Sequence, residues 1–315
     1  MSSSKIILIP SILFVALSFN VPIFSSCAEW SINATTFANI SLIGSTPHGL
    51  FINSENTVYS PARTLNQIHI WHGNNTVPTQ TISNNFSKPT SVFVNDQKDV
   101  FVDNGIYYKR VEHWISNTST VVAAMHVKGT CTGLFVDINN TLYCSMEDYH
   151  QVIKKLILNS LNTTAVAAGN GTNGFSPATL SRPQGIYVDL TLMLYVADCG
   201  NDRIQVFQSN PYNGTTIAGN GSLHTVSLNC PTSLAVDPYG YLFIVDSENH
   251  RIVGVGSNGS RCVVGCSGKG NGASQLSNPR VLSFDIHGNI FVTDWDNNRI
   301  QKFSLTNNNC SKYRT

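Results

Sequence analysis

The 315-residue chain contains an internal repeat, which constrains its fold more than any other feature. The segments RPQGIYVDLTLMLYVADCGNDRIQVF, CPTSLAVDPYGYLFIVDSENHRIVGV and NPRVLSFDIHGNIFVTDWDNNRIQKF begin at Arg182, Cys230 and Asn278 and align without a gap. They share two aspartates, an asparagine and an arginine at fixed spacing: Asp189, Asp198, Asn201 and Arg203; Asp237, Asp246, Asn249 and Arg251; and Asp285, Asp294, Asn297 and Arg299. A period of roughly 40–50 residues indicates an array of similar supersecondary units.

Three weaker copies precede these units. They are TPHGLFINSENTVYSPARTLNQIHIW from Thr46, KPTSVFVNDQKDVFVDNGIYYKRV from Lys88 and GTCTGLFVDINNTLYCSMEDYHQVIKKL from Gly129. Gln67 and Gln151 replace the arginine, and the second aspartate is missing from the first and third copies. The hydrophobic pattern persists in all three. The sequence therefore predicts six units, which start near residues 47, 89, 131, 183, 231 and 279.

Hydrophobic residues alternate with a period of two inside each unit, as in Ile186 and Val188 and then Leu194 and Val196. This period is typical of β-strands. A fourth short run follows, as in TTIAGNG from Thr215. Four short strands per unit describe a propeller blade. We predict an all-β, six-bladed β-propeller with four antiparallel strands per blade, in which residues 37–44 supply the last strand and close the ring.

The stretch DCGNDR lies between the second and third strands, so Asp198, Asn201 and Arg203 occupy a hairpin turn. Asx side chains cap backbone amides in such turns. An exposed pair between Asp198 and Arg203 would contribute about 0.2–1 kcal/mol. Because a function at one site would not need the same triplet in three units, we interpret the recurring Asp, Asn and Arg residues as structural.

The N-terminus carries the apolar run IILIPSILFVALSF after Lys5, followed by the small residues of SSCA. This pattern is typical of a secretory signal, and Ser26 and Ala28 predict cleavage after Ala28. The expected domains are a signal peptide at residues 1–28 and a propeller at residues 29–315, secreted to the extracellular space and without a membrane association after cleavage. The net charge of +1 argues against nucleic acid as a partner.

Twelve Asn-x-Ser/Thr motifs fit a secretory route and predict N-glycosylation at some of their asparagines. They stand at Asn33, Asn39, Asn74, Asn85, Asn117, Asn139, Asn162, Asn170, Asn213, Asn220, Asn258 and Asn309.

Eight cysteines predict disulfide bonds, which are stable in an oxidising compartment. Cys199 and Cys230 are expected to pair because both lie on one face of adjacent blades. Cys262 and Cys266 are expected to close a short loop, with a redox or metal role as the alternative. Cys131 and Cys144 lie on adjacent strands of the third unit, but they are about four residues away from facing each other. They can form a disulfide only if a β-bulge intervenes. Cys27 can meet Cys310 only if cleavage spares Cys27.

The segment from Pro183 to Phe207 resembles the NHL repeat, a β-propeller family, through P-x-G-I-x-V-D, L-Y-V-A-D and N-x-R-I-Q-x-F. The resemblance covers residues 47–303, most strongly in the second half, and implies a propeller but no single activity. RNA-binding members present a basic face, which the near-zero net charge does not match. The similar peptide-amidating lyase holds zinc with histidines in a Pro-His setting, and here only Pro47-His48 fits. We therefore expect no metal and no cofactor.

A propeller directs ligands to one end of its axis, on which loops from all blades converge. We expect a binding face that combines the six residues at the start of the first strands with four turn residues: His48, Thr90, Thr132, Gln184, Thr232 and Arg280, and Glu248, His250, Trp295 and Asp296. Trp295 is expected either to be exposed for binding or to pack over a neighbouring blade. The preferred function is non-enzymatic binding of an extracellular protein, peptide or glycan. The alternative is a metal-dependent hydrolase or lyase that uses the axial channel.

Overall fold

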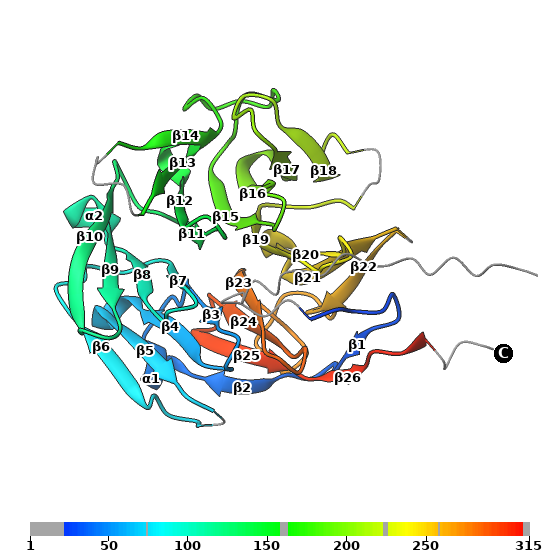
Figure 1. Ribbon diagram of the computed structural model, residues 1–315. Coiled ribbons are helices and arrows are strands. Elements are labelled where there is room, and N and C mark those ends of the chain that lie inside the picture. Colours follow the sequence, from blue (N-terminus) through cyan, green and yellow to red (C-terminus); the bar gives the residue numbers. More distant parts are fainter. Residues whose placement is uncertain (1–21, 74, 158–162, 223–225, 258, 311–315) are drawn as a thin grey trace, which may run out of the picture.

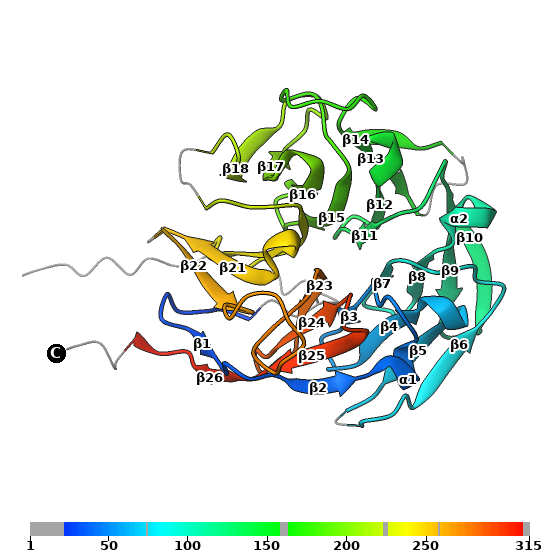
Figure 2. The ribbon, with the colours of Figure 1, turned by 180° about the vertical axis from the view of Figure 1, so that it is seen from behind.

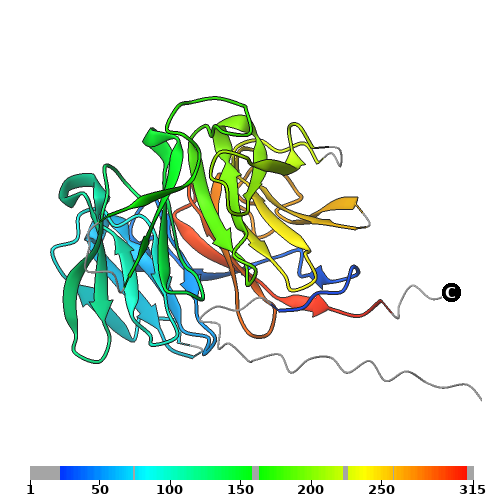
Figure 3. The same cartoon turned by 45° about the horizontal axis from the view of Figure 1, so that its top comes forward.

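Six four-stranded antiparallel sheets surround a central axis in the computed structural model, which describes residues 22–73, 75–157, 163–222, 226–257 and 259–310 (Figure 1). The ring is seen from behind in Figure 2 and tilted in Figure 3. The predicted all-β, six-bladed propeller is confirmed. In each blade the first strand lies nearest the axis and the fourth lies outermost.

Blades 1 to 3 take up the N-terminal half of the chain. Blade 1 contains β3 (Phe51–Ile52), β4 (Val58–Ala62), β5 (Gln67–Trp71) and β6 (Gln80–Ser83). Blade 2 contains β7 (Val92–Val94), β8 (Val100–Asp103), β9 (Arg110–Ile115) and β10 (Thr120–His126). Blade 3 contains β11 (Gly133–Val136), β12 (Thr141–Met146), β13 (Gln151–Leu156) and β14 (Ala165–Ala168).

Blades 4 to 6 contain the three well-matched repeats. Blade 4 contains β15 (Pro183–Val188), β16 (Leu194–Asp198), β17 (Arg203–Phe207) and β18 (Thr215–Gly219). Blade 5 contains β19 (Pro231–Val236), β20 (Leu242–Asp246), β21 (Arg251–Gly256) and β22 (Gly259–Val264). Blade 6 contains β23 (Pro279–Phe284), β24 (Ile290–Asp294), β25 (Arg299–Phe303) and, from the other end of the chain, β2 (Thr35–Ala38).

The ring closes by the expected route, but the closing strand is shorter and lies further upstream. β2 pairs with β25, with Thr35 opposite Lys302 and Ala38 opposite Ile300. The predicted range 37–44 was wrong in its second half, where Ile40–Ile43 form the short helix α1. Asn39 caps this helix, because its side chain accepts a hydrogen bond from the backbone N–H of Ser41.

The propeller has two faces. Face A carries the loops into the first strands and the turns between the second and third strands, which include the 3₁₀ turns η1 (Arg63–Leu65), η2 (Glu147–Tyr149), η3 (Cys199–Asn201) and η4 (Ser247–Asn249) and the helix α2 (Gly105–Tyr108). Face B carries the other hairpins. On face B the first aspartate of a repeat fixes the turn: Asp189 Oδ1 accepts hydrogen bonds from the backbone N–H groups of Thr191 and Met193.

The second aspartate of a repeat joins three parts of its blade on face A, and we call this aspartate together with its Asn and Arg partners the joint. Asp198 Oδ1 accepts from the backbone N–H of Ser181 at 2.6 Å, and Oδ2 accepts from Asn201 Nδ2 at 2.8 Å and Arg203 Nε at 2.7 Å. Asp246 and Asp294 repeat the arrangement. The Asp198 and Arg203 side chains are 0% and 3% exposed, so this is a buried pair, unlike the exposed pair for which a small energy was expected.

Four disulfides link the eight cysteines. Cys199–Cys230 joins blades 4 and 5, and Cys262–Cys266 closes a short loop, as the sequence indicated. Cys131 also pairs with Cys144. The register of β11 and β12 is regular from Gly133 onward, but Thr132 N–H also donates to the Ser145 carbonyl, so the backbone leaves this register just before β11. Cys131 lies before β11 begins at Gly133 and is therefore not held in the register of that strand.

The chain ends meet beside blade 6. Strand β1 (Glu29–Trp30) pairs with β26 (Leu305–Asn307), and Cys27 is bonded to Cys310. Residues 1–21 of the expected signal peptide lie outside the described residues. Residues 22–28, together with β1, β26 and the Cys27–Cys310 disulfide, form a segment beside blade 6 that we call the terminal annex. Within the part of the chain that the structure describes, no helix has the length and apolar character needed to cross a membrane.

Candidate functional site

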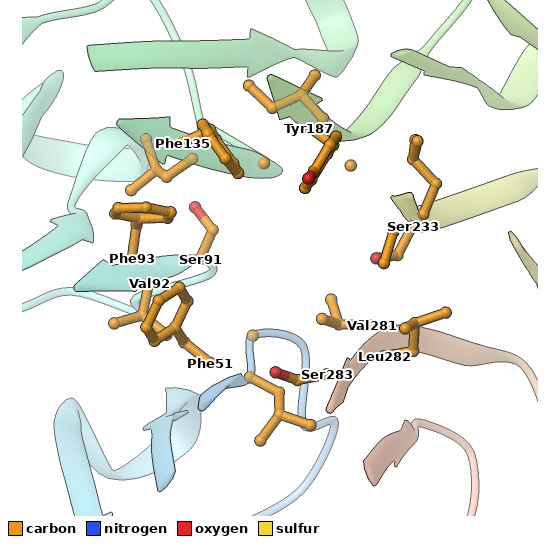
Figure 4. A pocket seen from close by; sticks show the side chains of 18 of the residues that line it. Phe51, Ser91, Val92, Phe93, Phe135, Tyr187, Ser233, Val281, Leu282 and Ser283 are labelled. Carbon is orange, nitrogen blue, oxygen red and sulfur yellow. The ribbon is translucent and has the colours of Figure 1, made fainter. Parts of the chain in front are cut away.

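A cavity of about 110 Å³ lies on the propeller axis and is lined by the first strands of all six blades (Figure 4). Phe51, Phe93, Phe135 and Tyr187 come from blades 1 to 4, and neighbouring rings in this series lie 4.8, 4.9 and 5.3 Å apart between centroids. The equivalent position holds Ser283 in blade 6. The cavity thus has an aromatic side and a side of small residues, and its aromatic rings also pack the blades together.

The six residues at the start of the first strands do not all face a ligand. Thr132 Oγ1 donates to the Pro183 carbonyl at 3.1 Å, and Thr232 Oγ1 donates to the Arg280 carbonyl at 2.9 Å. Both hydroxyls therefore hold one blade to the next. Gln184 is buried, and its carbonyl accepts a hydrogen bond from Ser145. These three residues of the predicted binding face contribute to blade packing.

Three of the four predicted turn residues also have roles within the fold. His250 Nδ1 accepts from the backbone N–H of Asn278, and Asp296 Oδ2 accepts from Asn278 Nδ2 at 2.6 Å. The backbone N–H of Glu248 donates to the Asn229 carbonyl. Burial lowers the pKa of His250, which favours the neutral ring that accepts this bond.

Arg280 and Trp295 form a stacked pair on blade 6. The Arg280 guanidinium lies 4.5 Å from the centroid of the Trp295 ring, which is half-buried. Neither Arg280 Nε nor Trp295 Nε1 has a hydrogen-bond partner among the described residues, although both atoms are buried. Trp295 therefore stacks on Arg280 of its own blade and keeps one buried donor unpaired within the described residues.

His48 lies on blade 1, next to blade 6 in the ring. Burial, together with the neighbouring positive charges of Arg280 and Arg63, lowers the pKa of His48 to about 3. Its imidazole is therefore neutral near pH 7. His48 Nδ1 and Arg63 Nε are also buried and lack a partner in the described part of the chain.

Asp103 on blade 2 occupies the position of the joint aspartates but has different contacts. Its Oδ1 accepts from the backbone N–H groups of Gly105 and Cys131, at 3.0 and 2.9 Å. Its Oδ2 finds no partner in hydrogen-bonding geometry among the described residues. Burial raises the pKa of Asp103 to about 7, against the lowering effects of these N–H groups, Thr90 and Arg63.

We call His48, Arg63, Asp103, Arg280 and Trp295 the axial cluster; none of the five lines the cavity described above. Electrostatic coupling connects its charged members, since Arg63 and Arg280 both act on His48, and Arg63 also acts on Asp103. The pKa of Arg280 is lowered by burial and raised by Glu147. Glu147 belongs to blade 3, opposite blade 6, so the charge of Arg280 is felt across the axis.

Two members of the axial cluster, Arg63 and Asp103, were missed by sequence reasoning. Arg63 directly follows Ala62, which replaces the joint aspartate in blade 1, and Asp103 is followed by Asn104 and Arg110, whose side chains donate to Glu112 instead. The sequence feature that could have pointed to Arg63 and Asp103 is the departure of blades 1 and 2 from the repeat. A recurring residue supports the fold, whereas a departure frees a side chain for another role.

We find no candidate metal site among the described residues. No group of three or more His, Cys, Asp or Glu side chains there could hold a metal ion.

Known structures with a similar fold have diverse descriptions. A protein of unknown function from Bacteroides thetaiotaomicron is 14% identical, with a TM-score of 0.68 over 87% of this chain and 76% of that one. A streptogramin B lyase is 14% identical, with a TM-score of 0.63 over 87% and 97%. A gluconolactonase from Xanthomonas campestris is 12% identical, with a TM-score of 0.59 over 91% and 98%. At such identities the likeness shows the fold alone.

Comparison with curated proteins gives no match. The family model described as NHL repeat matches residues 228–254, which include β19, β20 and most of β21 of blade 5. The segments that resemble it from the sequence form the neighbouring blades with the same four-stranded topology. The protein is a six-bladed β-propeller that carries an NHL repeat.

Proposed function

We propose that the protein is a secreted, glycosylated propeller whose axial cluster binds a carboxylate group of an extracellular peptide, protein or glycan without transforming it. The supporting observation is the group of five buried polar atoms without a partner in the described chain: His48 Nδ1, Arg63 Nε, Asp103 Oδ2, Arg280 Nε and Trp295 Nε1. A buried polar group left unpaired costs about 1–3 kcal/mol. A ligand that supplies the missing partners would remove this cost.

The donor set favours an anionic group. Arg63 and Arg280 are cations with an unused Nε donor, and a guanidinium matches the geometry of a carboxylate. Two of the acidic groups that act on Arg280 already have partners, because Glu147 accepts from Arg182 at 2.6 Å and Asp296 accepts from Ser277 and Asn278. Asp103, with a pKa of about 7, is partly protonated near neutral pH and can then donate a hydrogen bond.

The distribution of glycosylation motifs fits a ligand that approaches face A. All nine motif asparagines in the described residues are exposed; Asn74, Asn162 and Asn258 lie outside them. Five are placed toward face B by the topology: Asn33, Asn117, Asn139, Asn213 and Asn309. The other four, Asn39, Asn85, Asn170 and Asn220, follow the outermost strands of their blades at the rim of face A. Glycans at these positions would leave the axis accessible from face A.

The binding test uses an array of acidic peptides and glycans, in which each carboxylate member has a neutral amide counterpart. We expect binding to carboxylate members and loss of binding on amidation. Arg63→Gln and Arg280→Gln should each weaken the affinity by about 10–100-fold, because a hydrogen bond to a charged group contributes about 1.5–3 kcal/mol. Calorimetry with the tightest array member measures the change.

Lys98→Gln provides the matched control, since it also removes one positive charge. Lys98 lies on face B in an exposed pair with Glu55 and should not affect binding. Equal binding of the amides, or equal loss in all three variants, would contradict the proposal. Mass spectrometry of the bound compound tests the alternative, because its chemical conversion with loss on chelation would identify a metal-dependent hydrolase or lyase.

A further inference from the structure

The segment just before β1 is part of the folded propeller. The Phe24 side chain is 6% exposed, and its ring lies 5.2 Å from Trp30, 5.1 Å from Phe243 and 5.0 Å from Phe284 between centroids. Phe243 belongs to β20 of blade 5 and Phe284 to β23 of blade 6. Phe24 therefore fills a space between two blades, and its removal would leave a cavity there.

Polar and covalent bonds hold the same segment. The backbone N–H of Ser25 donates to Asn308 Oδ1 at 2.8 Å, and Asn308 Nδ2 donates to the Ile23 carbonyl at 3.0 Å. Ala28 is fully buried, and its carbonyl accepts a hydrogen bond from Arg261. Cys27 is bonded to Cys310, with Cα atoms 5.2 Å apart.

Cleavage after Ala28 conflicts with these contacts. It would remove Phe24 from the core, release the Arg261 donor and leave Cys310 without its disulfide partner. A chain with seven cysteines cannot pair all of them within one molecule, whereas the described structure has no free cysteine. The mature protein therefore needs residues 23–28.

We infer that the leader is removed upstream of Phe24, between Ser18 and Phe19. The apolar run ends at Phe19, and Ala16 and Ser18 supply the small residues that a signal-peptidase site requires. Hydrolysis adds one water across this peptide bond, so that the leader ends in the Ser18 carboxylate and the mature chain begins with the Phe19 amine. The inference rests on the secretory route of the proposed function but not on its ligand.

The test is mass spectrometry of the full chain after expression in cells that secrete it. Blocking free thiols, removing glycans and then sequencing the N-terminal peptide should give a chain that begins at Phe19, with Cys27 linked to Cys310 and no blocked thiol. A secreted chain that begins at Glu29, with Cys310 blocked, would overturn this inference and leave secretion intact. A chain that keeps Met1 and stays inside the cell would overturn both.

Paired variants separate the two cleavage sites. Ser18→Leu places a bulky residue at the inferred site and should leave the leader attached and reduce secretion several-fold. Ser26→Leu blocks the site after Ala28 at an exposed position and should change neither the N-terminus nor the secreted amount. The opposite pattern would overturn the inference. Phe24→Ala should also lower the melting temperature, whereas Ile23→Ala at a residue 51% exposed should not.

Discussion

A residue in the same position of the repeat has a different role in different blades. Asp198, Asp246 and Asp294 each use both carboxylate oxygens within their own blade and pair with an arginine. Asp103 instead uses only Oδ1, because the Asn104 and Arg110 side chains that follow it donate to Glu112. Its burial without an ion-pair partner raises its pKa, which makes it a sensitive probe of the axial cluster.

Asp103→Asn is expected to change the pH dependence of stability. The folded-state pKa of Asp103 is about 7, above its ordinary value of 3.8, so the folded protein keeps a proton that the unfolded chain loses. Stability from this group is therefore present at low pH and lost as pH rises from 3.8 to about 7. Asparagine keeps the Oδ1 acceptor without the charge. Denaturant unfolding at pH 8 should show a gain of about 1–4 kcal/mol, and at pH 4 little change.

Asp198→Asn is the control for this prediction. It stands at the same position of the repeat but removes the charge that Arg203 needs, so it should destabilise the protein at pH 8. His48 has the opposite dependence, because its pKa is lowered from 6.5 to about 3 and its stability contribution is lost as pH falls. The variant therefore has to be compared with wild type at each pH. A gain that is the same at pH 4 and pH 8 would contradict the role given to Asp103.

At the scale of elements, residues 37–44 form two elements, the end of β2 and the helix α1, although the sequence predicted a single strand. The stretch FANISLIG resembles one strand by its apolar content, but only Thr35–Ala38 pair with β25. Asn39 then caps α1, and Gly44 ends it with a φ of +71°, a left-handed conformation that favours glycine. The strand supplies Ala38 to a core with Ile43, Trp71 and Phe291, which joins blades 1 and 6.

Ala38→Glu should disrupt ring closure. Ala38 is 2% exposed, and a glutamate there would bury an unpaired charge, at a cost of several kcal/mol. Thermal unfolding and limited proteolysis of blade 6 measure the effect. Thr35→Glu tests the same strand at an exposed residue and should change stability by less than about 0.5 kcal/mol. Similar losses in both variants would show that burial of Ala38 is not the cause.

At the scale of the whole molecule, the two ends of the chain close the propeller twice. β2 completes blade 6, and the annex of β1, β26 and the Cys27–Cys310 disulfide ties the termini together. The sequence separation across this disulfide is 283 residues, against 4 residues for Cys262–Cys266. The Cys27–Cys310 bond therefore restricts the unfolded chain much more than the Cys262–Cys266 bond does.

Removing the terminal disulfide should destabilise the protein more than removing the short one. The loop-entropy relation gives about 5–6 kcal/mol for Cys27→Ser with Cys310→Ser, and about 2 kcal/mol for Cys262→Ser with Cys266→Ser. Denaturant unfolding of the two double variants measures the difference. Equal losses would mean that the terminal bond does not constrain the unfolded ensemble in this way.

The sequence by itself determined the number of blades, their strands and the structural role of the repeated aspartates. These features depend on alternation and turn chemistry among residues close along the chain, as in the Asp189 turn and the Asp198 joint. Only the tertiary structure decided which side chains form the axial cluster and which cysteine Cys27 meets. His48, Asp103 and Arg280 lie on three blades, and their unpaired atoms and shifted pKa values arise from burial and coupling that exist only once the ring has closed.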